Sequence, residues 1–111
     1  MILTVFRARL RADADMTAVA ALGERIYALA TAMPGFVSYK DYTAEDGENV
    51  TIVEFASEAE QLAWRNQPEH RDAQERGRRE FFAEYQIQVC RVERAYRFDP
   101  TEGRVEASAG G

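Results

Sequence analysis

The sequence predicts an α+β fold built on one four-stranded antiparallel sheet, and three observations carry this prediction. Strand and helix patterns alternate along the chain in the order strand, helix, strand, strand, helix, strand. An Asp46-Gly47 step between the two middle strands is typical of a hairpin turn, so these strands should be antiparallel neighbours. The 111 residues, 46% of them hydrophobic, suffice for a single packed domain. With right-handed βαβ crossovers, this order is that of a ferredoxin-like βαββαβ fold.

The first part of the chain supplies a strand and the clearest helix. Residues 2–10 are rich in Ile, Val, Phe and Thr, and their apolar side chains alternate onto both faces of the predicted strand. Residues 12–35 carry one apolar stripe at helical spacing, and Pro34-Gly35 ends the helix. The stripe consists of Met16, Val19, Leu22, Ile26, Leu29 and Met33. Candidate capping residues at its start are Asp13, Asp15 and Thr17.

The middle of the chain is a hairpin followed by a capped helix. Residues 36–43 and 50–56 have the composition of strands. Ser57 and Glu60 form a capping box, in which the side chain of each residue can accept a hydrogen bond from the backbone N–H of the other. A second helix therefore begins there. Pro68 interrupts this helix and is well placed in the first turn of a further helical segment.

The last part of the chain completes the order of elements. The helical segment after the proline is expected to run over residues 69–85, with a solvated face of alternating charge. Residues 86–98 are predicted to form one long final strand. Residues 1–98 are thus predicted to be one packed domain, and the Gly-rich residues 99–111 a tail that is flexible or docks on a partner.

Composition excludes several classes of protein. A net charge of -5 argues against nucleic-acid binding, and no apolar run is long enough for a membrane span. The first residues lack the basic lead-in of a signal peptide, so a cytoplasmic location is expected. Cys90 and His70 are the only residues of their types, which leaves no internal disulfide and no closed zinc site. Cys90 is expected to be a buried, small apolar residue.

The strand at residues 2–10 also predicts a partner. Two helical segments cover only one face of a four-stranded sheet, yet this strand is apolar on both faces. A large apolar face is not stable in water on a single chain. A second copy of the same chain, packed sheet against sheet, is the simplest cover, so we expect a homodimer.

Three stretches of the sequence together resemble a known family. They are MPGFVSYKDY at residues 33–42, VTIVEFASEAEQLAW at residues 50–64 and NQPEHRDAQERGRREFF at residues 66–82. Across residues 2–98 the chain resembles the antibiotic biosynthesis monooxygenase family, within the dimeric α+β barrel superfamily. The resemblance implies a dimeric α/β barrel. It also implies one of two activities, which are oxidation of an aromatic substrate by O₂ without metal or flavin, or binding and breakdown of haem.

The resemblance favours the cofactor-independent branch, acting on a phenolic or enolic, polyketide- or quinol-like small molecule. Such an enzyme deprotonates its substrate, so that the electron-rich anion can pass an electron to O₂. Trp64 matches the family's tryptophan and would hydrogen-bond the substrate, while His70 would move the proton. Tyr39, Phe81 and Arg7 are the candidate substrate-binding residues. No cofactor and no metal are expected.

Two alternatives to this oxygenase stay open. Haem breakdown is disfavoured because the position of the axial histidine is Gln74 and residues 2–10 contain no asparagine. The other alternative is a non-catalytic small-ligand-binding or stress-related dimer, with Trp64 a core aromatic and His70 a surface residue. The cofactor-independent branch also has an asparagine one helical turn before its tryptophan, where this chain has Glu60.

Overall fold

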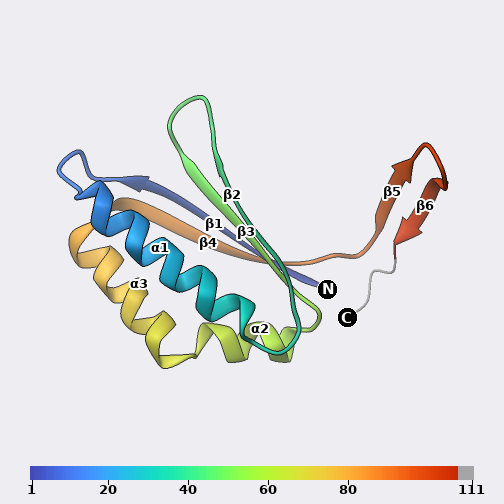
Figure 1. Ribbon diagram of the computed structural model, residues 1–111, viewed down its shortest axis with the longest axis horizontal. Helices are drawn as coiled ribbons and strands as arrows, with labels where there is room; N and C mark the ends of the chain where they lie inside the picture. Colours follow the sequence, from blue (N-terminus) through green and yellow to red (C-terminus); the bar gives the residue numbers. More distant parts are fainter. Residues whose placement is uncertain (108–111) are drawn as a thin grey trace.

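The computed structural model describes residues 1–107 and contains a four-stranded antiparallel sheet with helices on one face (Figure 1). The strand order is β2-β3-β1-β4, so that the first strand lies in the middle. This is the predicted ferredoxin-like α+β arrangement. The strands of this sheet are β1 (Ile2–Leu10), β2 (Phe36–Thr43), β3 (Asn49–Phe55) and β4 (Phe82–Arg91).

Three helices cover the sheet, and their ends follow the predicted signals. They are α1 (Met16–Thr31), α2 (Glu58–Arg65) and α3 (Pro68–Glu80). Asp15 caps α1, since its carboxylate accepts hydrogen bonds from the backbone N–H groups of Thr17 and Ala18. Ser57 caps α2 in the same way, and Pro68 occupies the first turn of α3. No helix within residues 1–107 is long and apolar enough to cross a membrane.

Helix α3 ends earlier than the sequence predicted. It stops at Glu80, whereas the expected segment ran to Tyr85. The following residues enter β4, where the rings of Phe82 and Tyr85 contact the ring of Phe6 at centroid distances of 5.4 Å each. Aromatic side chains favour strands, and this cluster outweighs the helical spacing of the same residues. The prediction of helix over the last five of those residues was wrong.

The final strand is also divided. The predicted strand over residues 86–98 becomes the end of β4 and a separate strand, β5 (Ala95–Asp99), which pairs with β6 (Gly103–Ala107). Arg91 pairs with Ile2, the first residue of β1, so β1 offers no residue with which β4 could pair beyond Arg91. The β5–β6 hairpin projects away from the sheet (Figure 1). Residues 108–111 of the predicted tail lie outside the described residues.

The core lies between the helices and the sheet. Its most buried members are Ala30, Val53, Phe55 and Trp64. Even-numbered residues of β1 face this core, as shown by Ile2, Thr4 and Ala8, which are all buried. Odd-numbered residues therefore face away from the helices. Leu3 and Val5 lie on this outer face, which confirms that the strand is apolar on both sides.

Cys90 lies on the outer face of β4, opposite Leu3, and is exposed in the chain. The expectation that it is buried was wrong, because β4 is an edge strand and no helix covers its outer face.

Candidate functional site

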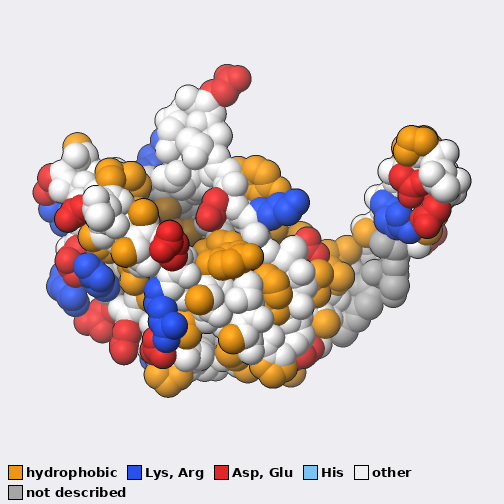
Figure 2. All heavy atoms as spheres, in the orientation of Figure 1, with side chains coloured by type: hydrophobic (Ala, Val, Ile, Leu, Met, Phe, Trp, Pro, Cys, Tyr) orange, Lys and Arg blue, Asp and Glu red, His pale blue; other side chains and the backbone are white. Residues whose placement is uncertain are grey.

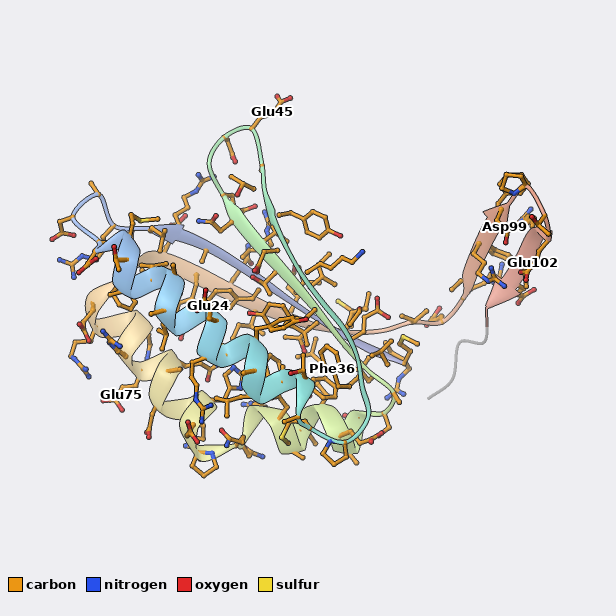
Figure 3. All side chains as sticks on the ribbon, in the orientation of Figure 1. Glu24, Phe36, Glu45, Glu75, Asp99 and Glu102 are labelled. Atoms are coloured by element: carbon orange, nitrogen blue, oxygen red, sulfur yellow. The ribbon has the colours of Figure 1, made fainter. Side chains whose placement is uncertain are left out.

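A cleft of about 1070 Å³ lies between the helices and the inner face of the sheet. It is at the upper end of the size range of small-molecule sites. In Figure 2, hydrophobic side chains gather on the face between α1 and the β2–β3 hairpin, with charged side chains around them. Figure 3 shows side chains from α1 and from the sheet reaching into this region, while Glu45 lies at the distant tip of the β2–β3 hairpin.

The junction between α2 and α3 positions two of the predicted residues. Asn66 ends α2, and the side-chain oxygen of Gln67 accepts a hydrogen bond of 2.8 Å from the backbone N–H of His70. Gln67 therefore caps α3, and Pro68 holds the first turn in helical geometry. The short junction folds the chain back, so that His70 meets Trp64 of the preceding helix.

His70 and Trp64 form a stacked pair. Their ring centroids are 4.0 Å apart, and His70 Nδ1 lies 3.0 Å from the backbone oxygen of Trp64. A carbonyl oxygen only accepts, so Nδ1 carries the proton of the neutral ring and Nε2 keeps a lone pair. Burial lowers the pKa of His70, and the hydrogen bond to the carbonyl opposes this shift less strongly. The ring is thus held neutral with Nε2 as a proton acceptor.

The indole nitrogen of Trp64 is a donor without an acceptor. The residue is 4% exposed, and Nε1 is buried with no hydrogen-bond partner among residues 1–107. Its ring packs against Phe55 at a centroid distance of 5.4 Å. A buried N–H without a partner costs free energy, which an acceptor that reaches it would offset. Trp64 lines the cleft, as does His70.

Gln61 is a site residue that the sequence analysis missed. It is buried, lines the cleft, and its Nε2 donates to Thr4 Oγ1 at 3.2 Å. Glu60, where the resemblance implies an asparagine, instead bonds to Ser57 at the beginning of α2 and is not among the residues lining the cleft. Its position in the sequence could have identified it. Residues three apart on a helix share a face, and Gln61 precedes Trp64 by three residues.

The other candidate residues divide between the cleft and the outer face. Tyr39 and Phe81 line the cleft. Burial, with a smaller effect of the Asp41 carboxylate, raises the pKa of Tyr39, so that its phenol stays protonated as a donor. Arg7 is an odd-numbered residue of β1, pairs with Glu48, and is not among the residues lining the cleft. The structure brings together Trp64, His70, Tyr39 and Phe81 but leaves Arg7 apart from them.

Potential metal and haem ligands are sparse in the cleft. Residues 1–107 contain no group of three His, Cys, Asp or Glu side chains placed to hold a metal ion. Gln74 lines the cleft from α3, at the position where the haem branch has its axial histidine. An amide is a poor ligand for haem iron, so Gln74 does not supply the axial nitrogen that the resemblance implies for the haem branch.

Comparison with known proteins assigns the family. A family model described as antibiotic biosynthesis monooxygenase matches residues 1–76. The chain belongs to the antibiotic biosynthesis monooxygenase family. The matched region includes Trp64, His70 and Gln61. Among curated proteins, the uncharacterized protein YqjZ of Bacillus subtilis is 32% identical over 71 residues, which span 64% of this chain and 62% of that protein.

Several solved structures share the fold. The SnoaB structure, a cofactor-independent oxygenase from Streptomyces nogalater, has a TM-score of 0.72 at 14% identity and covers 85% of this chain and 94% of SnoaB. Rv0793 of Mycobacterium tuberculosis has a TM-score of 0.70 at 22% identity, covering 80% and 91%. A dimeric ferredoxin-like protein from Thermobifida fusca has a TM-score of 0.66 at 16% identity, covering 80% and 88%.

Proposed function

We propose that this member of the antibiotic biosynthesis monooxygenase family is a cofactor-independent monooxygenase that oxidises a phenolic or enolic small molecule with O₂. The single observation that carries the proposal is the pair of complementary groups on one cleft wall. The buried Nε1–H of Trp64 has no acceptor among residues 1–107, and Nε2 of His70 keeps its lone pair. A phenol or enol offers both the proton for His70 and the oxygen for Trp64.

The proposed reaction has a deprotonation and an electron transfer. His70 Nε2 takes the proton of the hydroxyl group, and Trp64 Nε1–H stabilises the resulting oxyanion. The electron-rich anion passes one electron to O₂, and the two radicals combine to form a carbon–oxygen bond. The attacked carbon is the methylene of the substrate's keto form. The peroxide anion takes the proton back from His70, and loss of water from the resulting hydroperoxide leaves a carbonyl group. The substrate methylene thus becomes a carbonyl, one oxygen atom of O₂ enters the product, and the other leaves as water.

The size and chemistry of the cleft support an aromatic substrate of more than one ring. Its volume of about 1070 Å³ exceeds what a single phenol would fill. The aromatic side chains of Tyr27, Tyr39 and Phe81 line it, and stacked or edge contacts with them would hold a planar ligand.

Oxygen consumption with a phenolic anthrone, 1,8-dihydroxyanthrone, tests the proposal. We expect uptake above the rate without protein, and one atom of ¹⁸O from labelled O₂ in the product carbonyl. Uptake equal to the rate without protein, for this compound and for a panel of quinols, would contradict an oxygenase. Saturable binding without uptake would instead support the non-catalytic ligand-binding alternative.

We also propose that the chain is a homodimer. The outer face of the sheet carries Leu3, Val5, Val50 and Ile52, and no helix of the chain covers it. The β5–β6 hairpin supports the same proposal, because an isolated two-stranded hairpin is marginally stable and Phe98 on it is 71% exposed. Docking of both surfaces on a second copy would bury them. Light scattering is expected to give twice the 12.6 kDa chain mass, and a monomer would contradict the proposal.

A further inference from the structure

Helix α2 buries an amide beside an exposed leucine. Gln61 is 3% exposed, whereas the next residue, Leu62, is 40% exposed. Burial of a polar amide costs free energy unless its hydrogen bonds are satisfied, and an apolar side chain would pack in such a position without that cost. The helix therefore turns a polar side chain inward and an apolar one outward, which packing alone does not explain.

The contacts of Gln61 use only part of its hydrogen-bonding capacity. Its Nε2 donates to Thr4 Oγ1 at 3.2 Å, which joins α2 to β1. A primary amide has two N–H donors and an oxygen acceptor, so this bond employs one N–H and leaves the other groups of the amide for another partner. Gln61 lines the same cleft as Trp64, which follows it by three residues and so lies on the same face of α2.

We infer that Gln61 is a substrate-binding residue that, together with Trp64, selects the ionised form of the substrate oxygen. The inference rests on the proposed oxygenase function, because it assigns a second donor to the oxyanion that His70 creates. Trp64 Nε1 supplies one N–H group, and the second N–H of Gln61 supplies another. Thr4 fastens the amide to β1, since its oxygen accepts from the first N–H.

The cationic side chains that line the cleft are poorly placed to stabilise an anion. Arg65 and Arg78 are the arginines that line it, and both are exposed. The guanidinium of Arg78 donates to the hydroxyl of Tyr85. Arg78 lies on α3, eight residues after His70. An exposed guanidinium is screened by solvent and stabilises a nearby anion weakly. Preorganised N–H groups in a water-excluded site stabilise developing negative charge without that screening.

The ionisation of a bound chromophoric phenol tests the inference. The probe is 4-nitro-1-naphthol, whose phenol and phenolate forms differ in absorption, titrated without oxygen so that binding is read without reaction. For the wild-type chain, we expect the pKa of the bound probe to lie below its value in water. Gln61→Met, which removes the N–H donors at nearly constant volume, is expected to raise that bound pKa by about one unit, a tenfold relative loss of phenolate binding.

Thr4→Val is the matched control for a purely structural role. It removes the same hydrogen bond between α2 and β1 but keeps both N–H groups of Gln61. We expect it to lower the free energy of unfolding as Gln61→Met does, yet to shift the bound pKa much less. Thr4→Ser, which keeps the hydroxyl, should restore the wild-type value.

Equal pKa values for the wild type, Gln61→Met and Thr4→Val would show that Gln61 only fastens α2 to the sheet and would overturn the inference. Absence of saturable probe binding to the wild type would overturn it too. A Gln61-dependent pKa shift without oxygen uptake would refute the proposed oxygenase activity and leave Gln61 as a binding residue. Failure of one proposal is thus distinguishable from failure of the other.

Discussion

The imidazole ring of His70 lies against the indole ring of Trp64, with the ring planes inclined by only 19°. The same imidazole donates through Nδ1 to the Trp64 carbonyl. Trp64 therefore determines both the orientation and the tautomer of the histidine. The sequence separation of six residues becomes direct contact because α2 ends and α3 begins between them. The two stacked rings thereby line the same part of the cleft.

Substitution of Trp64 by Phe tests the donor role of the indole. The variant keeps an aromatic ring against His70 and Phe55 but removes the buried N–H. We expect oxygen uptake with 1,8-dihydroxyanthrone to fall by about a hundredfold, the scale found when one oxyanion donor is lost. Urea unfolding checks that the variant folds. Tyr96→Phe, on the projecting hairpin, should leave uptake unchanged, and equal rates for the wild type and Trp64→Phe would refute the role of the indole.

The lowered pKa of His70 predicts loss of stability in mild acid. The unfolded histidine takes up a proton near its ordinary pKa of 6.5, whereas the buried one does so only at lower pH. Between these two values the unfolded state binds more protons, so the free energy of unfolding falls as pH decreases from about 6.5 toward the folded pKa. This contribution is fully present above pH 6.5.

Urea unfolding at pH 5 and pH 8 measures this effect. His70→Gln carries no titrating ring, so we expect its free energy of unfolding to change less between the two pH values than that of the wild type. His70 is the only histidine of the chain, which makes the comparison direct. An unchanged difference between the two pH values would show that other groups cause the acid sensitivity.

Gly35 is required by its backbone conformation and by its neighbour. Its φ is +78°, and a Cβ atom there would overlap the carboxylate of Glu60, which caps α2 through Ser57. We expect Gly35→Ala to lower the free energy of unfolding by about 1–3 kcal/mol. Gly23→Ala is the matched control, because Gly23 lies in α1 with open space around it. We expect this substitution to raise the free energy of unfolding by about 0.5–1 kcal/mol. Equal effects of the two changes in urea unfolding would contradict this account.

The order of elements was predictable because local signals agreed with the sheet. The Asp46-Gly47 turn, the Ser57 cap and the Pro68 break each depend on a few neighbouring residues, and each is present in the structure. The two errors arose where tertiary contacts decide. The aromatic cluster around Phe6 draws residues 82–85 from the helix into β4, and β4 ends where β1 offers no further partner.

The candidate site was predictable only in part, for a related reason. Trp64 and His70 were candidates because of the family resemblance and their spacing, and the structure adds that they touch and that one tautomer is selected. Gln61 was missed because its partner, Thr4, lies 57 positions away on β1. Arg7 was a candidate because the sequence alone did not decide which face of the strand its side chain occupies. Its odd-numbered position on β1 turns the side chain to the outer face, beside Glu48.

Val5 on the outer face provides a test of the proposed homodimer. It lies opposite Ile52 of β3, on the side of the sheet that no helix covers. A lysine at this position would place a charge at the centre of the proposed interface, where burial of an unpaired charge is costly. In an isolated chain the same lysine could extend into water, and the fold would tolerate it.

We therefore expect Val5→Lys to halve the mass measured by light scattering and to keep the wild-type circular dichroism. Ala21→Lys, on the exposed side of α1, introduces the same charge away from the proposed interface and should leave the mass unchanged. Because the fraction of chains in a dimer rises with protein concentration at constant affinity, the Val5→Lys variant should regain mass only well above the concentration at which the wild type is dimeric. A Val5→Lys variant that stays dimeric at every concentration would place the interface elsewhere, and a wild-type monomer would remove the need for a cover on this face.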